Sequence, residues 1–167
     1  MRKGLIVFLL VLLVLSVINV PVFAAESINE TSDQVSNKAV AHHTRESLKS
    51  QINSEEAKSG DYLIDDWYCE IREMDNGKVE LYGWTQCNRN CEEVSVELQL
   101  QQWTGSNWTT LGTYEFAGFD TNYTWGKKNV SVTGKNSYRV KSRHYAEDGS
   151  VTDQTTAATE GIYVNQF

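Results

Sequence analysis

Alternation of apolar and polar residues is the strongest pattern in this chain, and it is clearest around residue 140. One row of positions comprises Tyr138, Val140, Ser142, His144 and Ala146, and the intervening row comprises Arg139, Lys141, Arg143, Tyr145 and Glu147. Successive side chains of a β-strand point to opposite faces, so the pattern predicts a strand with the first row buried and the second solvated. Asp148-Gly149 follows and supplies the positive-φ residues of a tight hairpin turn. Residues 138–151 are therefore predicted to form a strand, a turn and the start of a returning strand.

A second stretch, residues 94–101, alternates with equal regularity. Its apolar positions are Val94, Val96, Leu98 and Leu100, and its polar positions are Ser95, Glu97, Gln99 and Gln101. We expect the apolar row in the core and the polar row in water. Turn residues follow at 104–107 and bring Trp103 beside Trp108, a pairing that usually stabilises a hairpin.

A third hairpin is predicted around Asn76-Gly77, which separates two stretches rich in aromatic and β-branched residues. A two-residue turn would place Glu73 opposite Glu80, which is a like-charge pair. A three-residue loop with Gly77 in the left-handed conformation instead pairs Ile71 with Leu81. Cross-strand pairs of matched character are favoured, so we predict the three-residue loop.

About seven short strands separated by turn residues are expected between residues 61 and 167, with no helix of consequence among them. This spacing predicts an all-β domain, an antiparallel two-sheet sandwich of the immunoglobulin-like or fibronectin-like kind. A small closed barrel is the competing architecture.

The N-terminus has a different pattern. A basic head, Met1-Arg2-Lys3, precedes an apolar run from Leu5 to Leu15 and a small-residue end at residues 22–25. These features predict a signal peptide over residues 1–24, cleaved after Ala24 or alternatively Ala25, and therefore a secreted protein that leaves the membrane after cleavage. The polar residues 25–60 predict a disordered linker or pro-segment, because they could bury little apolar surface.

The net negative charge of the chain counts against one class of binding partner. The chain has 22 Asp and Glu against 15 Lys and Arg, a net charge of −7, and loss of Arg2 and Lys3 would leave 13 against 22, or −9. This acidity argues against nucleic acid as a partner.

Three cysteines, Cys69, Cys87 and Cys91, cannot all pair within one chain. In an exported protein Cys87 and Cys91 could form a disulfide that closes a small loop, and free thiols are the equal alternative. Cys69 falls opposite Gly83 in the three-residue register, which suits a buried thiol. No second cysteine pair or nearby histidine completes a zinc site, so we predict no metal.

Several segments together resemble a known family. They are residues 61–66, 98–101 before the Trp hairpin, 138–144, Asp148-Gly149, and the ending Gly161-Ile162-Tyr163-Val164-Asn165. They are similar to small secreted proteins of Gram-positive bacteria classed as a domain of unknown function, DUF6147. The resemblance covers roughly residues 61–165 and implies a signal peptide, a variable acidic spacer and one all-β domain. It implies no catalytic residues, because none are assigned in the family.

The residues favour binding over catalysis. The predicted binding strip comprises Arg139, Lys141, Arg143 and Tyr145, with Gln99, Gln101 and Trp103 beside it if the two alternating strands are neighbours. Aromatic rings with Gln and Arg between them could stack on and hydrogen-bond a glycan, another cell-envelope polymer or an extracellular protein. The alternative is an ordinary solvated sheet face, in which Glu97 pairs with an arginine.

Two other functions stay open. A small secreted hydrolase would use His144, which pairs with Asp153 if Asp148-Gly149 are the central turn residues, together with nearby carboxylates. A secreted toxin or bacteriocin-like effector is the third possibility. No nucleophile elbow, phosphate loop, dinucleotide fingerprint or calcium loop is present, and we predict no cofactor. We therefore predict a secreted, non-enzymatic binding module.

Overall fold

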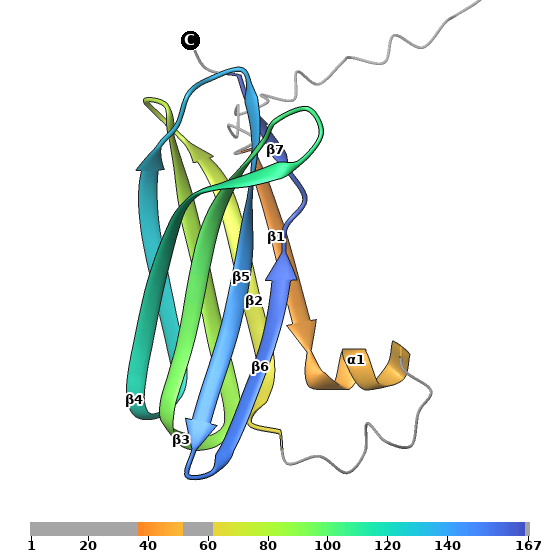
Figure 1. Ribbon diagram of the computed structural model, residues 1–167, viewed down its shortest axis with the longest axis vertical. Helices are drawn as coiled ribbons and strands as arrows, with labels where there is room; N and C mark the ends of the chain where they lie inside the picture. Colours follow the sequence, from red (N-terminus) through yellow and green to blue (C-terminus); the bar gives the residue numbers. More distant parts are fainter. Residues whose placement is uncertain (1–36, 52–61, 166–167) are drawn as a thin grey trace, which may run out of the picture. The chain divides into compact units, whose positions relative to one another are not determined.

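A single curled antiparallel sheet makes up almost all of the described chain (Figure 1). The structure is a computed structural model and describes residues 37–51 and 62–165. The elements in that part are β1 Lys38–Thr44, α1 Arg45–Gln51, β2 Ile64–Met74, β3 Lys78–Trp103, β4 Trp108–Ser131, β5 Asn136–Asp148, β6 Val151–Ala158 and β7 Ile162–Val164. The prediction of an all-β antiparallel fold is confirmed. No helix in these residues is long and apolar enough to cross a membrane.

Strand β3 folds back on itself, and this bend shapes the sheet. The hydroxyl of Thr85 donates a hydrogen bond to the carbonyl oxygen of Ser95 at 2.9 Å, although ten residues of a straight strand would span roughly 33 Å. The reversal lies between Gln86 and Cys91, where the pairing of β3 with β4 is interrupted. Strand β4 also turns beside it, as Figure 1 shows.

The bends divide the sheet into two halves. The first half-sheet contains β1, β2, the start of β3 (residues 78–86) and the end of β4 (residues 123–131). The second half-sheet contains the end of β3 (residues 91–103), the start of β4 (residues 108–119), β5, β6 and β7. Two sheets were predicted. Strands β3 and β4 each run through both half-sheets, so the described strands form one sheet instead.

The inner faces of the two half-sheets pack together as the core. The predicted buried rows are confirmed: Val94, Val96, Leu98, Leu100, Tyr138, Val140, Ser142, His144 and Ala146 are all at most 1% exposed. They face an inner row of the first half-sheet that includes Ile71, Val79 and Leu81, each fully buried. Gly83 lies at the contact between the halves, where an added Cβ would come within 2.7 Å of Leu98 Cδ2.

Two predicted hairpins have the expected register. Ile71 pairs with Leu81 across the loop at 75–77, and Gly77 has a φ of 66°. Trp103 pairs with Trp108, with ring centroids 5.4 Å apart.

The predicted turn at Asp148-Gly149 is displaced by one residue. Asp148 pairs with Val151, so the central turn residues are Gly149 and Ser150. Gly149 has a φ of 60° and occupies the first central position, where one of the two common hairpin turns requires glycine. Pairing partners on β6 therefore shift by two residues, which leaves the same side chains on the same face.

The prediction of a disordered linker over residues 25–60 is wrong for residues 38–51, which form β1 and α1. Strand β1 pairs with β2 from Lys38 opposite Arg72 to Thr44 opposite Asp66. Its inward positions are Ala39, Ala41 and His43, which are small or polar, and this explains the weak hydrophobic signal. The predicted signal peptide and the rest of the linker lie outside the described residues.

Substitution of Gly83 tests the contact between the half-sheets. We expect Gly83→Ala to lower the free energy of unfolding by about 1–3 kcal/mol, because the added methyl overlaps the Leu98 side chain and the Tyr68 backbone. Urea denaturation provides the measurement. Gly112→Ala is the matched control, since its Cβ would meet only the hydroxyl end of the movable Tyr114 side chain. Equal losses in both variants would show that Gly83 has no special packing role.

Candidate functional site

Four aromatic side chains form a row across the outer face of the first half-sheet. His42 is paired with Tyr68, Tyr68 with Trp84, and Trp84 with Trp125, so one ring comes from each of β1, β2, β3 and β4. Residues that are directly opposite in neighbouring strands point to the same face. We call His42, Tyr68, Trp84 and Trp125 the aromatic row.

The rings of His42, Tyr68 and Trp84 contact one another, and Trp125 contacts the ring of Tyr82 beside the row. Tyr68 and Trp84 are stacked, with centroids 5.8 Å apart and an interplanar angle of 10°, and His42 lies 5.9 Å from Tyr68. Tyr82 and Tyr123 extend the surface on either side, at 6.2 Å from Trp125 and 6.0 Å from Trp84 respectively. Trp125 is 55% exposed, so the row offers an accessible apolar surface on a rigid sheet.

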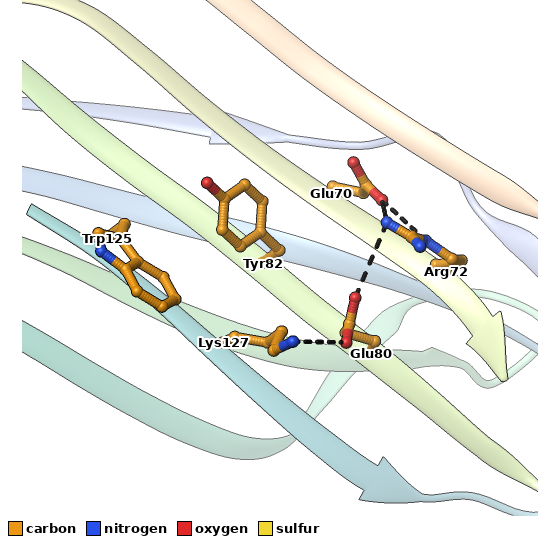
Figure 2. A pocket seen from close by; sticks show the side chains of 6 residues that line it. All are labelled: Glu70, Arg72, Glu80, Tyr82, Trp125 and Lys127. Carbon is orange, nitrogen blue, oxygen red and sulfur yellow. Dashed lines mark hydrogen bonds and ion pairs between the residues drawn. The ribbon is translucent and has the colours of Figure 1, made fainter.

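A groove lined by charged side chains borders the aromatic row. Figure 2 shows its lining residues, and we call it the charged groove: Glu70, Arg72, Glu80, Tyr82, Trp125 and Lys127. Strand register explains the grouping, because Glu70, Tyr82 and Lys127 come next to the aromatic row on three adjacent strands.

Glu70 is the most constrained side chain of the groove. It is 4% exposed and accepts hydrogen bonds from Arg72 Nη2 at 2.7 Å and Arg72 Nε at 3.1 Å. Lys38 Nζ lies 3.0 Å from the other carboxylate oxygen, to which the Tyr68 hydroxyl also donates. Burial alone would raise the pKa of Glu70, but these donors together hold it below its usual value. Burial and the bond to Glu70 raise the pKa of Tyr68.

Glu80 is held more loosely. Arg72 Nη2 lies 3.8 Å from one oxygen of its carboxylate and Lys127 Nζ lies 3.5 Å from the other. The exposed Lys127 ammonium can exchange this long ion pair for hydrogen bonds to ligand hydroxyls, whereas Glu80 is only 8% exposed. Acid catalysis of glycoside cleavage needs a carboxyl group with a raised pKa, and the shift of Glu70 has the opposite sign.

The predicted binding strip lies on the outer face of the second half-sheet. The expectation that the whole polar row of residues 94–101 is solvated is wrong for Ser95 and Gln101, which are 4% and 7% exposed because β4 and β5 flank β3 on both sides. Gln99 pairs with Lys141 and Gln101 with Arg139, so the expected adjacency of the two strands is confirmed. Arg139 Nε donates to Gln101 Oε1 at 2.9 Å. Whether these residues bind a ligand stays a prediction.

Arg143 of the predicted strip makes contacts within the sheet. Arg143 donates to Gln154 Oε1 at 3.0 Å and lies over the ring of Tyr145, while Glu97 accepts a hydrogen bond from Gln99. Within the described residues no ion pair joins Glu97 to Arg143, although the two are directly opposite.

His144 is a fully buried part of the core, and its predicted couple with Asp153 is wrong. The displaced turn pairs His144 with Thr155 and leaves Asp153 opposite Ala146. Asp153 instead accepts hydrogen bonds from Arg45 Nη2 at 2.6 Å and from the backbone of Leu63 and Ile64. These bonds tie the α1 region and the start of β2 to β6.

The imidazole of His144 is bonded to two hydroxyl groups. Thr85 Oγ1 lies 2.8 Å from Nδ1 and Ser142 Oγ lies 2.8 Å from Nε2. Because Thr85 donates its proton to Ser95, Nδ1 must donate to Thr85, and Nε2 then accepts from Ser142. Burial, with a smaller contribution from His43, lowers the pKa of His144 to about 3.

Cys87 and Cys91 lie at the two ends of the bend in β3 as buried free thiols, and Cys91 Sγ donates a hydrogen bond to the carbonyl oxygen of Arg89 at 3.4 Å. Burial and the neighbouring Cys91 raise the pKa of Cys87 to about 12. Cys69 lies opposite Gly83 and is fully buried, as predicted, and burial raises its pKa to about 11.

The aromatic row was missed by sequence reasoning, although part of the signal was present. Tyr68, Glu70 and Arg72 alternate with buried residues on β2, and Glu80, Tyr82 and Trp84 do so on β3. The predicted hairpin register already placed Tyr68 opposite Trp84. The neighbours on either side, His42 and Trp125, could not be placed, because the pairing of β1 and of the end of β4 was unknown.

No protein-family model matches the chain, and no curated protein matches it. The resemblance to DUF6147 therefore stays a prediction. Among the residues that the structure describes, no cluster of three or more histidine, cysteine, aspartate or glutamate side chains could hold a metal ion.

The burial of His144 leads to a test by pH. Below its unfolded pKa of about 6.5 the unfolded chain binds a proton at His144, whereas the folded protein does so only near 3. As the pH is lowered from 6.5 to 3, this one residue should therefore reduce the free energy of unfolding by about 1.4 kcal/mol for each pH unit.

His144→Gln removes the titrating group, so urea denaturation between pH 7 and pH 4 should give a shallower pH dependence than the wild type. The wild-type slope also contains the carboxylates, and only the difference between the two proteins reports on His144. Identical slopes would mean that His144 takes up its proton equally in the folded and unfolded states.

Proposed function

We propose that this protein is an exported, non-enzymatic module that binds an extended glycan of the cell envelope or extracellular matrix. The observation that carries the proposal is the aromatic row, which crosses four adjacent strands beside the charged groove. Export is supported by the N-terminal pattern of basic head, apolar run and small-residue end.

The aromatic row suits a ligand with repeated flat apolar faces. Four strands about 4.8 Å apart place the row over roughly 14 Å, which is long enough to contact more than one ring of a polymer. Sugar rings present C–H faces that pack on aromatic side chains, and their hydroxyls can bond to the exposed Lys127 in the adjoining groove.

Rigidity of the sheet favours this use. Tyr68 is fixed by its stacking on Trp84 and by its bond to Glu70, so little side-chain entropy is left to lose on binding. A preorganised aromatic surface on a β-sheet therefore supports binding of the polymer without a conformational change.

The proposal is tested by truncating the aromatic row. We expect Trp84→Ala and Trp125→Ala each to weaken binding to insoluble neutral β-glucan or to purified bacterial cell wall about tenfold, because tryptophans are among the residues that contribute most of the binding energy of such surfaces. Depletion of the protein from solution by the insoluble polymer gives the affinity.

Phe119→Ala is the matched control, since Phe119 is 68% exposed and lies outside both the aromatic row and the charged groove. Its truncation should leave binding unchanged. Thermal unfolding of all three variants separates lost contacts from lost folding. Wild-type binding by both Trp variants, or no retention of the wild-type protein by either polymer, contradicts the proposal.

Export would place the cysteines in an oxidising environment, where disulfides form and persist. We propose that Cys87 and Cys91 form a disulfide in the exported protein, which would fix the bend of β3. Oxidation removes one proton and one electron from each thiol, forms one S–S bond and passes both electrons to a thiol–disulfide oxidoreductase. The raised thiol pKa values leave little thiolate at neutral pH, so uncatalysed oxidation should be slow.

Alkylation in denaturant counts the free thiols of the exported protein. Iodoacetamide should add to Cys69 alone before reduction and to all three cysteines after reduction, as read by intact mass. In Cys91→Ser, both remaining cysteines should react without reduction. Three adducts on the unreduced wild-type protein would contradict the disulfide.

A further inference from the structure

A second aromatic groove lies on the outer face of the other half-sheet. It is lined by Trp103, Trp108, Ser137 and Gly161, where the β3–β4 hairpin meets β5 and the connection from β6 to β7. Trp103 is 38% exposed. The Trp108 ring packs directly over Gly161, where the Cβ of any other residue would lie 2.8 Å from the ring.

An arginine is positioned at this groove. The guanidinium carbon of Arg139 lies 4.5 Å from the centre of the Trp108 ring, and its Nε donates to Gln101 Oε1. Within the described residues the two terminal nitrogens of Arg139 make no hydrogen bond or ion pair, so they are free to donate to a ligand in the fork geometry that fits a carboxylate.

The two rows of side chains nearest the groove on this face carry cations, whereas the carboxylate of Glu97 lies one row further on and Glu160 adjoins Gly161 at the edge. The two nearest rows of the face pair Gln101 with Arg139 and Gln99 with Lys141, and β4 contributes Thr110 and Thr113 to them. These rows contain two cations and no carboxylate, on a chain with a net charge of −7. A positive area on an acidic protein is complementary to an anionic ligand.

We propose that this tryptophan–arginine groove is a second binding site and that it takes a sugar ring bearing a carboxylate. The ring packs on Trp103, the carboxylate bonds to the Arg139 guanidinium, and Lys141 attracts the next acidic residue of the polymer. Because the inner faces of the half-sheets pack together, the two outer faces point away from each other. One molecule can then bridge an acidic glycan and a neutral glycan, and this bridging part of the inference rests on the proposed function.

Polygalacturonate and neutral β-glucan are the two probes. Arg139→Gln and Trp103→Ala should each weaken binding to polygalacturonate at least fivefold and leave binding to the neutral glucan unchanged, while Trp84→Ala should do the reverse. Raising the salt concentration to about 0.5 M should weaken only polygalacturonate binding, because exposed charges are screened. Lys78→Gln removes an exposed cation from the other half-sheet and serves as the charge-matched control.

The outcomes separate the two proposals. Polygalacturonate binding that needs Arg139 and Trp103 supports the second site, whether or not the neutral glucan is bound. Absence of neutral-glucan binding would count only against the aromatic row as a glucan-binding site. Wild-type affinity for polygalacturonate in both Arg139→Gln and Trp103→Ala overturns the second site. So does an equal loss in Lys78→Gln, because the effect would then be one of net charge.

Discussion

The bend of strand β3 is the constraint on which the other features depend. Its first half pairs with β2 and its second half with β5, so a single strand joins both half-sheets. The hydrogen bond from Thr85 to Ser95 and the close approach of Gly83 to Leu98 hold the halves together across the core. A straight β3 would leave the row from Val94 to Leu100 without a partner, and no core would form.

Folding the sheet in this way creates two outer faces with different chemistry. The first half-sheet presents stacked aromatics beside buried carboxylates, and the second presents cations beside a Trp pair of which Trp103 is exposed. Neither face needs a loop or a moving element, because every functional side chain considered projects from a paired strand. Such surfaces suit binding of extended ligands better than chemistry, which usually needs an enclosed site.

The interior also contains polar groups with a structural role. Thr85, His144 and Ser142 form a buried hydrogen-bonded chain that spans the two half-sheets. Satisfying these groups avoids the penalty of buried unpaired donors, and it requires a neutral histidine. A residue that suggests catalysis in the sequence is thus used for packing, at the cost of sensitivity to acid.

Alternation alone determined the strand character of the chain and the buried rows, such as Tyr138 to Ala146, because the two-residue period is a local property of an extended backbone. Matched cross-strand pairs likewise fixed the register of Ile71 with Leu81. Tertiary structure decided the rest. β1 has only Ala39, Ala41 and His43 facing inward, and it is a strand because β2 offers an edge to pair with. The aromatic row exists because four strands from distant parts of the chain become neighbours, and neighbour identity depends on long-range packing that no local pattern encodes.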